Sequence, residues 1–363
     1  HILSQLDPRN EIWKDLILEE SVRELGSTLR DCTEEERKEV QDDINRNFDD
    51  SINRPDYARK LYLIEKCIYG VDIQSIAVQI SKLRFFISLV VDQKPTSDRT
   101  DNFGIRPLPN LEAKFVAANT LIGLNKEKNL FDNREIDKLQ AKLTQASHRI
   151  FGAKSNKSKN RWKERVMELQ TKIAEQLEVL SVVSPADAKL MREWKMFDQN
   201  ASSPFFDPEW MFGVSGGVDI VIGNPPYGVS IKGEYRKDIE RHLGKVPDYE
   251  IYYYFIQIAY RLLTNNGVLS YIIPNTYLFN TFADKYRINL AEKWNLLEIL
   301  DCSKFPVFES ATVLNTINTW QKCESSIIGY RNTSDVNSFK ELIAKPKLII
   351  SKKDLLSMNQ NSI

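Results

Sequence analysis

The sequence has few of the residues that bind transition metals or form disulfides. Its 363 residues include four cysteines and three histidines. The cysteines contain no Cys-x-x-Cys pair, so we expect neither a metal site nor a disulfide framework. A run of about 18 apolar residues is also absent, as is a charged-then-apolar leader. These absences predict a soluble, cytoplasmic protein in a reducing compartment, without a membrane partner.

Charge of either sign is not in excess. The 50 basic and 50 acidic residues give a formal net charge of +0. No overall field therefore attracts a nucleic acid, although binding needs only a basic face and not a basic protein. With 42% hydrophobic residues, the chain can bury one large core or two modest ones.

The most informative segment is an apolar run that ends in two prolines. Residues 218–222 are rich in β-branched side chains and predict a buried parallel strand. Gly223 and then Asn224-Pro225-Pro226-Tyr227 follow it. Ligands bind beyond the carboxyl ends of the strands in an open α/β sheet. The tetrapeptide is therefore predicted to lie at a ligand site.

These four residues suit chemistry on a planar amino nitrogen, which is a poor nucleophile until it is drawn toward tetrahedral geometry. The Asn224 side-chain oxygen and the Pro225 carbonyl are two acceptors that can do this, and both prolines stiffen the turn. Tyr227 offers a flat face to an extruded base, and such stacking contributes roughly 1 to 3 kcal/mol. The simpler alternative is that Pro225 and Pro226 only end the strand and that Tyr227 is a surface aromatic.

A second predicted strand, residues 67–73, ends near an acid. A helical pattern from Gln74 to about Val91 follows, with apolar residues at Ile76, Ile80, Leu83 and Ile87. In nucleoside-binding α/β folds an acid at this place commonly binds ribose hydroxyls, so Asp72 is a candidate for that role, with Ile73 beside the adenine. An aspartate that caps the following helix is the alternative.

The remaining elements alternate in type. Residues 114–118 predict a strand closed by Asn119, which either contacts a cofactor's adenine or caps the next helix. Later helices and strands are predicted at 249–263, 268–273, 282–294, 296–300 and 312–320. The alternation predicts an α/β fold with a doubly wound, mainly parallel sheet.

Residues 125–195 have a long, charged helical pattern that predicts an inserted helical hairpin. Its tip is rich in basic residues, namely Arg149, Lys154, Lys157, Lys159, Arg161, Lys163 and Arg165, with Trp162 among them. Such a cluster suits contacts with the phosphates of a duplex. A solvated tip without a partner is the alternative.

Several segments together resemble a known family, the adenine-N6 DNA methyltransferase part of bacterial type IIG restriction-modification enzymes, in which methylase and endonuclease share one chain. The resemblance spans roughly residues 55–320. The segments that carry it are 68–74, 82–86, 107–111, 198–213, 222–227 and 267–274. It implies a Rossmann-like fold, S-adenosyl-L-methionine as the methyl donor and double-stranded DNA as the partner.

The resemblance also assigns roles to residues of this chain. It implies that the cofactor is bound by Asp72, Ile73 and Asn119. It implies that catalysis depends on Asn224, Pro225, Pro226 and Tyr227. Tyr227 would stack on the flipped adenine, and Phe308 resembles a second aromatic wall for that base. Core packing is the alternative for Phe308.

One departure from the family is the missing Gly-rich loop that follows the family's first strand. Residues 1–66 contain nothing that replaces it, so we expect a truncated piece that binds the cofactor weakly. The domains we expect are a helical part (1–66), a cofactor half of the sheet (67–124), the hairpin (125–195), a catalytic half (196–325) and the start of a target-recognition region (326–363).

Two other functions remain open at the level of sequence. An amino-group methyltransferase that acts on protein glutamine or on RNA would use the same two acceptors. A vestigial, non-catalytic DNA-binding fragment would keep the fold without the reaction. The recognition sequence, the oligomeric state and the parent's ability to cleave DNA are not encoded in any motif that we find.

Overall fold

A computed structural model gives the fold. It describes residues 5–27, 34–106, 110–124, 126, 134–152, 156–247, 250–305, 307–308, 313–324, 327–351 and 353–354. Some of the predicted features lie outside these residues, among them Lys154 at the hairpin tip and residues 107–109 of the family resemblance.

The chain forms two compact units, which we describe separately. Unit 1 contains residues 1–119 and 124–213, and unit 2 contains residues 120–123 and 214–363. The division near residue 213 falls inside the predicted catalytic half, 196–325, and the predicted domain boundaries remain predictions.

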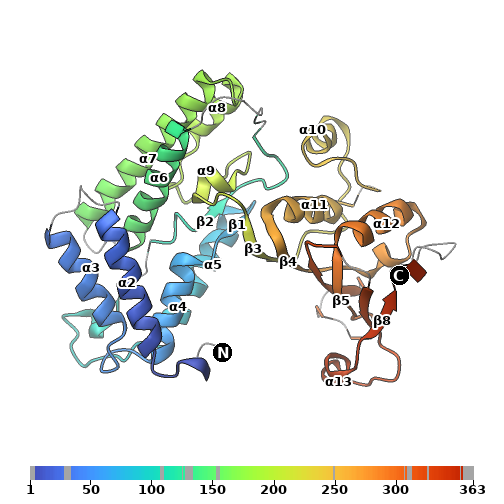
Figure 1. Ribbon diagram of the computed structural model, residues 1–363, viewed down its shortest axis with the longest axis horizontal. Helices are drawn as coiled ribbons and strands as arrows, with labels where there is room; N and C mark the ends of the chain where they lie inside the picture. Colours follow the sequence, from blue (N-terminus) through green and yellow to red (C-terminus); the bar gives the residue numbers. More distant parts are fainter. Residues whose placement is uncertain are drawn as a thin grey trace. The chain divides into compact units, whose positions relative to one another are not determined.

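Unit 1 is mostly helical around a short parallel sheet (Figure 1). Its strands are β1 (Gly70–Asp72) and β2 (Phe115–Ala117), which pair in parallel. Its helices are α2 (Glu11–Ser27), α3 (Glu34–Asn47), α4 (Pro55–Lys66), α5 (Ser75–Val90), the short η1 (Asn102–Gly104), α6 (Arg134–Gly152), α7 (Asn156–Val179), α8 (Pro185–Glu193) and α9 (Pro208–Phe212).

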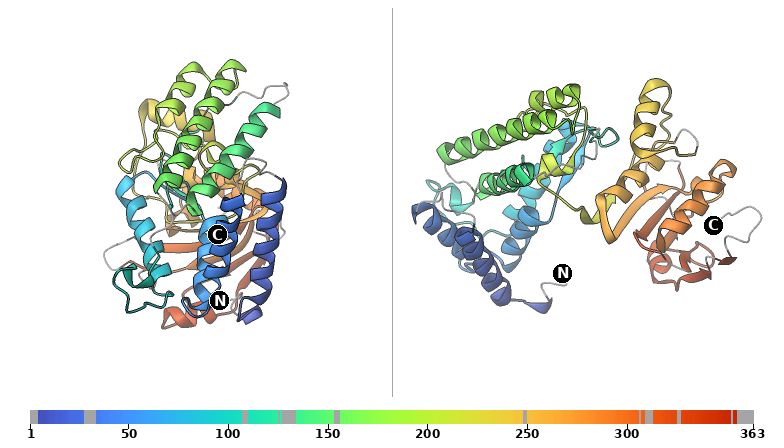
Figure 2. Two further views of the ribbon diagram at one scale, coloured as in Figure 1. Left: turned by 90° about the vertical axis from the view of Figure 1, so that its left-hand side faces the viewer. Right: turned by 45° about the horizontal axis from the view of Figure 1, so that its top comes forward.

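Two apolar cores hold the elements of unit 1. Phe115 and Ala117 of β2 pack with Leu89 of α5, Leu111 and the helix α4. In the predicted hairpin, α6 and α7 run side by side in both views of Figure 2. Ile150 of α6 and Val166 of α7 are both fully buried. The hairpin predicted from the charged helical pattern is therefore present, although its connection lies outside the described residues.

Unit 2 is a six-stranded mixed sheet with helices. The strand order is β3-β4-β6-β5-β7-β8. The strands are β3 (Val218–Gly223), β4 (Leu263–Pro274), β5 (Asn295–Asp301), β6 (Asn315–Gln321), β7 (Ile327–Arg331) and β8 (Leu348–Ser351). The helices are α10 (Gly233–Leu243), α11 (Tyr252–Leu262), η2 (Asn275–Leu278), η3 (Thr281–Ala283), α12 (Asp284–Lys293) and α13 (Phe339–Ala344).

The α/β class is confirmed, but a mainly parallel sheet is not. In unit 2, β3 with β4 and β5 with β7 are parallel pairs. The pairs β4 with β6, β5 with β6, and β7 with β8 are antiparallel. The physical reason is the short connections: β7 and β8 are neighbours with a helix of six residues between them, and antiparallel pairing needs no long crossover.

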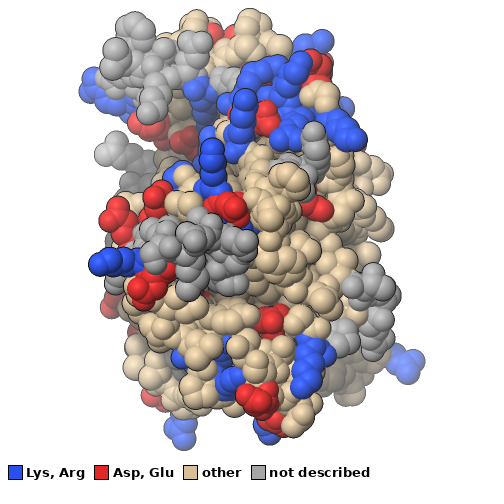
Figure 3. Space-filling view, turned by 90° about the vertical axis from the view of Figure 1, so that its right-hand side faces the viewer, with Lys and Arg blue, Asp and Glu red and all other residues tan. Residues whose placement is uncertain are grey.

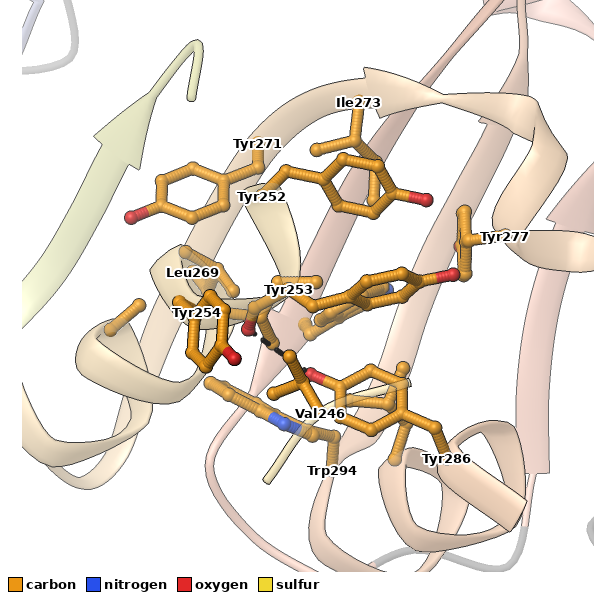
Figure 4. Close-up of a cluster of buried hydrophobic side chains, with 14 of the residues drawn as sticks. Val246, Tyr252, Tyr253, Tyr254, Leu269, Tyr271, Ile273, Tyr277, Tyr286 and Trp294 are labelled. Carbon is orange, nitrogen blue, oxygen red and sulfur yellow. Dashed lines mark hydrogen bonds between the residues drawn. The ribbon is translucent and has the colours of Figure 1, made fainter. Parts of the chain in front are cut away.

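The core of unit 2 is unusually aromatic. Figure 4 shows Tyr252, Tyr253 and Tyr286 close together under β4. The ring centroids of Tyr252 and Tyr253 are 4.4 Å apart, and those of Tyr253 and Tyr286 are 4.9 Å apart. The Tyr286 hydroxyl donates to the Tyr253 carbonyl at 3.4 Å, so one of the buried polar groups is satisfied within the cluster. The site strand β3 lies against this rigid core through β4.

One expectation about burial was wrong. The run 218–222 does form the parallel strand β3, but Ile220 is 67% exposed and Ile222 is 81% exposed. Among the described residues β3 pairs only with β4, at one end of the strand order. A strand on the border of a sheet has fewer neighbours to cover its side chains, and β-branched composition alone does not reveal that position.

Candidate functional site

The site in unit 2 begins where β3 ends. Gly223 is paired with Tyr271 of β4, and a Cβ at Gly223 would lie 3.0 Å from Cε1 of that ring. Glycine at this position therefore lets the backbone pass close to the ring before the chain turns outward. Burial raises the pKa of Tyr271, so the ring is a neutral wall under the strand end.

The two predicted acceptors are not engaged by other groups of the protein. Asn224 is exposed, and among the described residues no hydrogen bond involves its side chain. Pro225 is buried, and within the same part of the chain nothing donates to its carbonyl oxygen. Both oxygens thus have no partner in the part of the chain that the structure describes, and two prolines hold the backbone that carries them stiff.

The segment is fixed at its other end as well. The Gly228 N–H donates to Oε2 of Glu250 at 3.0 Å, and Ser230 forms an isolated antiparallel bridge with Glu250. Gly228 has φ 71°, a left-handed conformation that a glycine adopts without strain. Tyr227 is half-buried and packs against the aromatic core. Sequence reasoning missed Glu250, because it lies 22 residues beyond Gly228 and no local pattern marks it.

In unit 1, Asp72 lies at the carboxyl end of β1. Its exposed side chain accepts a hydrogen bond through Oδ1 from the Gln74 N–H at 2.8 Å, just before α5 begins. This bond joins residues two apart in a local turn, and the cap position of α5 is Gln74, so Asp72 does not cap that helix. The other oxygen has no partner among the described residues, so the geometry is also compatible with a ribose contact.

The neighbours of Asp72 line the same sheet edge. Asp72 is paired in parallel with Ala117, which places Asn119 two residues beyond the end of β2. Ile73 is 58% exposed. Asn119 is half-buried, and its N–H donates to the Ser203 carbonyl at 3.0 Å. The described residues 120–124 form no helix, so Asn119 does not cap a helix there.

Two serines at this edge were not found from the sequence. Ser202 donates through its hydroxyl to the Ile73 carbonyl at 3.0 Å. Ser203 forms a parallel bridge with Ala118 and continues the short sheet of unit 1. The segment around them contains turn residues typical of an irregular loop, so periodicity gave no signal for a strand-like contact.

The other predictions about sites have simpler outcomes. Phe308 is half-buried in unit 2, in a stretch without regular structure. Within the described residues no group of three metal-ligating side chains occurs, and no helix is long and apolar enough to cross a membrane. The predicted cofactor residues Asp72, Ile73 and Asn119 belong to unit 1, whereas the predicted catalytic and base-stacking residues, Asn224–Tyr227 and Phe308, belong to unit 2.

A stiff pair of unengaged acceptors beside an aromatic ring, at the carboxyl end of a strand in an α/β sheet, is the class of site that suits a planar amino or amide group. Comparison with known families identifies the class more closely. A family model described as "Eco57I restriction-modification methylase" matches residues 66–308. The chain belongs to this restriction-modification methylase family.

Curated relatives agree with that assignment. A protein of Methanocaldococcus jannaschii, whose name places it among type II restriction enzymes and methyltransferases, is 25% identical over 321 residues, covering 72% of this chain and 26% of the relative. The type II methyltransferase M.TthHB8I of Thermus thermophilus is 34% identical over 73 residues, which is 16% of each chain. This chain therefore spans about a quarter or less of the length of these relatives.

Solved structures give a weaker likeness. The structure of the type IIL restriction-modification enzyme MmeI in complex with DNA has a TM-score of 0.36 at 10% identity, covering 95% of this chain and 39% of that one. The type IIG restriction endonuclease BpuSI has a TM-score of 0.28 at 16% identity, covering 56% of this chain and 26% of that one. TM-scores this low carry no argument about activity.

Proposed function

We propose that this chain is the methylase part of a type IIG restriction-modification enzyme and that it methylates the N6 amino group of adenine in double-stranded DNA, with S-adenosyl-L-methionine as the donor. The family assignment supports a restriction-modification methylase. The observation that carries the choice of an amino nitrogen is the pair of unengaged acceptors, the side chain of Asn224 and the carbonyl of Pro225.

The acceptor pair prepares the nucleophile. Both N–H groups of an adenine amine donate, one to the Asn224 oxygen and one to the Pro225 oxygen, and the nitrogen moves out of plane with its lone pair directed at the incoming methyl group. When bound, the donor would supply the methyl group: an N–C bond would form at the expense of its C–S bond, the sulfur would keep that electron pair, and the amine would lose a proton to water. Because the prolines fix the two oxygens in advance, little reorganisation is needed during the reaction.

No covalent intermediate with the protein is part of this mechanism. Burial raises the pKa of the Cys302 thiol to about 11, which keeps it protonated and unreactive near neutral pH. Tyr227 stacks on the extruded base, and Phe308 forms a second wall. Stacking on such rings offsets part of the cost of extrusion, which is a few kcal/mol.

The residues of unit 1 fit an adenosine-containing cofactor. Asp72 keeps one unpartnered oxygen for ribose hydroxyls, and the exposed Ile73 offers an apolar surface to an adenine ring. Asn119 lies beyond the neighbouring strand end, at the same edge. When bound, S-adenosyl-L-methionine supplies a methyl group activated by its positive sulfur. We place the enzyme in the cytoplasm, where its DNA partner is accessible.

The first prediction tests the acceptor pair in the full enzyme that carries this chain. Asn224→Ala removes one of two acceptors, so we expect kcat for DNA methylation to fall by about 10²- to 10³-fold, as for the loss of one preorganised hydrogen bond. The affinity for duplex DNA should stay close to that of the unchanged enzyme. Radiolabelled methyl transfer and fluorescence anisotropy measure the two quantities.

Asn265→Ala is the matched control, because Asn265 is an exposed asparagine of unit 2 outside the site. It should leave both quantities unchanged. An Asn224→Ala enzyme with normal kcat would contradict the role of the acceptor pair. Methyl transfer to RNA or to a glutamine-bearing protein, in place of DNA, would overturn the proposed substrate while leaving the chemistry intact.

A further inference from the structure

The start of α7 carries an unusual concentration of positive charge. Within residues 156–163 every charged side chain is basic, and the first acid is Glu164. We call Lys157, Lys159, Arg161 and Lys163 the α7 basic start. It lies at one end of the hairpin formed with α6 (Figure 2).

Helix stability does not explain this charge. The amino end of a helix carries a partial positive charge, so acids there stabilise and bases destabilise, by about 0.3 to 1 kcal/mol each. Helix α6 follows the rule, with Glu135 and Asp137 in its first turn. Helix α7 has no acid in its first turn and instead has Lys157 and Lys159 there. Its sequence is therefore unfavourable for the isolated helix.

Ion pairing does not explain the charge either. Among the described residues, no acidic side chain pairs with Lys157, Lys159 or Lys163. Some basic side chains elsewhere are neutralised by an acid of their own helix. In α10, Arg236 pairs with Glu240 at 2.7 Å and Lys237 pairs with Glu234 at 2.6 Å.

The same contrast occurs within α7. Beyond the basic start, Arg165 and Lys172 share Glu168, with N–O distances of 2.7 and 2.6 Å. Figure 3 shows both acidic and basic side chains on the face that it draws, with basic ones gathered at its upper right. The α7 basic start therefore differs from the rest of its own helix, where acids accompany the bases.

Aromatic rings support two of these cations. The Arg161 guanidinium lies 5.0 Å from the Trp162 ring centroid, and the Lys163 ammonium lies 5.1 Å from that of Phe197. Such contacts restrict long side chains without neutralising them. Burial lowers the pKa of Lys82 in α5, while the charge of Glu112 raises it and that of Lys163 lowers it. Lys163 is therefore close enough to interact with α5, near which an acid is also present.

We propose that the α7 basic start binds the phosphate backbone of duplex DNA and holds the substrate without reading its sequence. The proposal rests on the proposed function, which supplies the polyanion. On α7, Lys159 and Lys163 share one face and Lys157 and Arg161 share another, because residues four apart lie above one another on a helix. Each face therefore offers two cations about 6 Å apart at the helical rise, close to two steps of a duplex. Basic side chains in this arrangement fit phosphates, whereas reading bases would need donors and acceptors directed into a groove.

The test uses the full enzyme and a triple variant, Lys157→Gln, Lys159→Gln and Lys163→Gln. Affinity should fall by a similar factor for duplexes with and without the recognition sequence. The slope of log K against log salt should become shallower by about 0.9 for each phosphate that is no longer neutralised, close to 3 in total. At saturating DNA, kcat should be unchanged.

The matched control is a second triple variant, Lys172→Gln, Lys189→Gln and Lys237→Gln. It removes the same charge, but each of these lysines already pairs with an acid of its own helix. Equal salt slopes for the two triple variants would overturn the proposal while the proposed function stands. If the unchanged enzyme binds no duplex DNA, both proposals fail, and methylation of another substrate would identify which chemistry remains.

Discussion

At the scale of single residues, local chemistry was predictable and contacts distant in sequence were not. Asp72 and Asn224 were found because a polar residue beyond an apolar strand is a local pattern, and both lie at strand ends in the structure. The turn contact from the Gln74 N–H to Asp72 was neither of the two alternatives that the sequence left open, a ribose contact and a helix cap. Glu250 and Ser202 act through partners far along the chain, so no local pattern identified them. The assigned catalytic and cofactor roles remain predictions.

Lys114 gives a prediction at this scale. Its side chain is buried, with Nζ 4.0 Å from the Tyr69 ring centroid, and burial lowers its pKa to about 8. In the unfolded chain the pKa of Lys114 is about 10.4. At a pH between the folded and unfolded pKa values, the unfolded state therefore binds more protons than the folded state. The free energy of unfolding should therefore rise as the pH increases from about 8 toward about 10.

The measurement compares the unchanged protein with Lys114→Met by urea unfolding at pH 7.0 and pH 9.5. Over this range the unchanged protein should gain about 2 kcal/mol relative to the variant, because only it loses a buried charge. The variant should also be the more stable of the two at pH 7.0. Parallel pH dependences for both proteins would show that Lys114 keeps an ordinary pKa.

At the scale of elements, whether a segment forms a helix or a strand was easier to predict than how deeply its side chains are buried. The helix expected over 282–294 is α12, the strand expected over 296–300 is β5, and the strand expected over 268–273 is β4. The last of these starts five residues earlier, at Leu263, because Asn266 adopts a left-handed φ of 64° that lets the chain continue irregularly. Apolar periodicity carries no information about such a local conformation.

For the helix after β1, the apolar pattern did not predict which side chains are buried. Periodicity correctly predicts the helix α5, but Ile76 and Leu83, part of the pattern that indicates it, are exposed. The buried side of α5 carries Val78 and Leu89. An apolar pattern shows which residues share a face, whereas burial of that face depends on neighbouring elements that the pattern does not specify.

The pairing of β1 with β2 gives a prediction about elements. A Cβ at Gly70 would lie 2.4 Å from Cδ1 of the buried Phe115 ring, so Gly70→Ala forces the strand or the ring to shift. We expect a loss of about 1 to 3 kcal/mol in the free energy of unfolding, typical of overpacking. Urea unfolding monitored by circular dichroism measures it.

The control for this prediction is the same substitution in a Phe115→Leu background. The smaller side chain leaves room for the new methyl group, so Gly70→Ala should cost clearly less there than in the unchanged protein. An equal cost in both backgrounds would mean that the clash with this ring is not the cause, and that the backbone freedom of glycine is responsible instead.

At the scale of the whole molecule, composition limited the number of cores and the net charge, but it did not predict how the strands are arranged. The expectation of one large or two modest cores is compatible with the two units found here. A net charge of +0 excluded a strong global field, and the α7 basic start shows that a local concentration of charge can still occur. The mixed pairing of the larger sheet was not predictable, because strand order depends on contacts between segments that local patterns do not relate.

The exposed isoleucines of β3 have a consequence for the chain in solution. A sheet margin with uncovered Ile222 and free backbone groups accepts a strand from another molecule. Ile222→Lys should therefore slow the growth of scattered light in concentrated samples, whereas Ile343→Lys, at an exposed helical isoleucine, should not. Equal growth in both variants would contradict this. Association of the isolated chain should then depend on this one strand, and dilution should slow it.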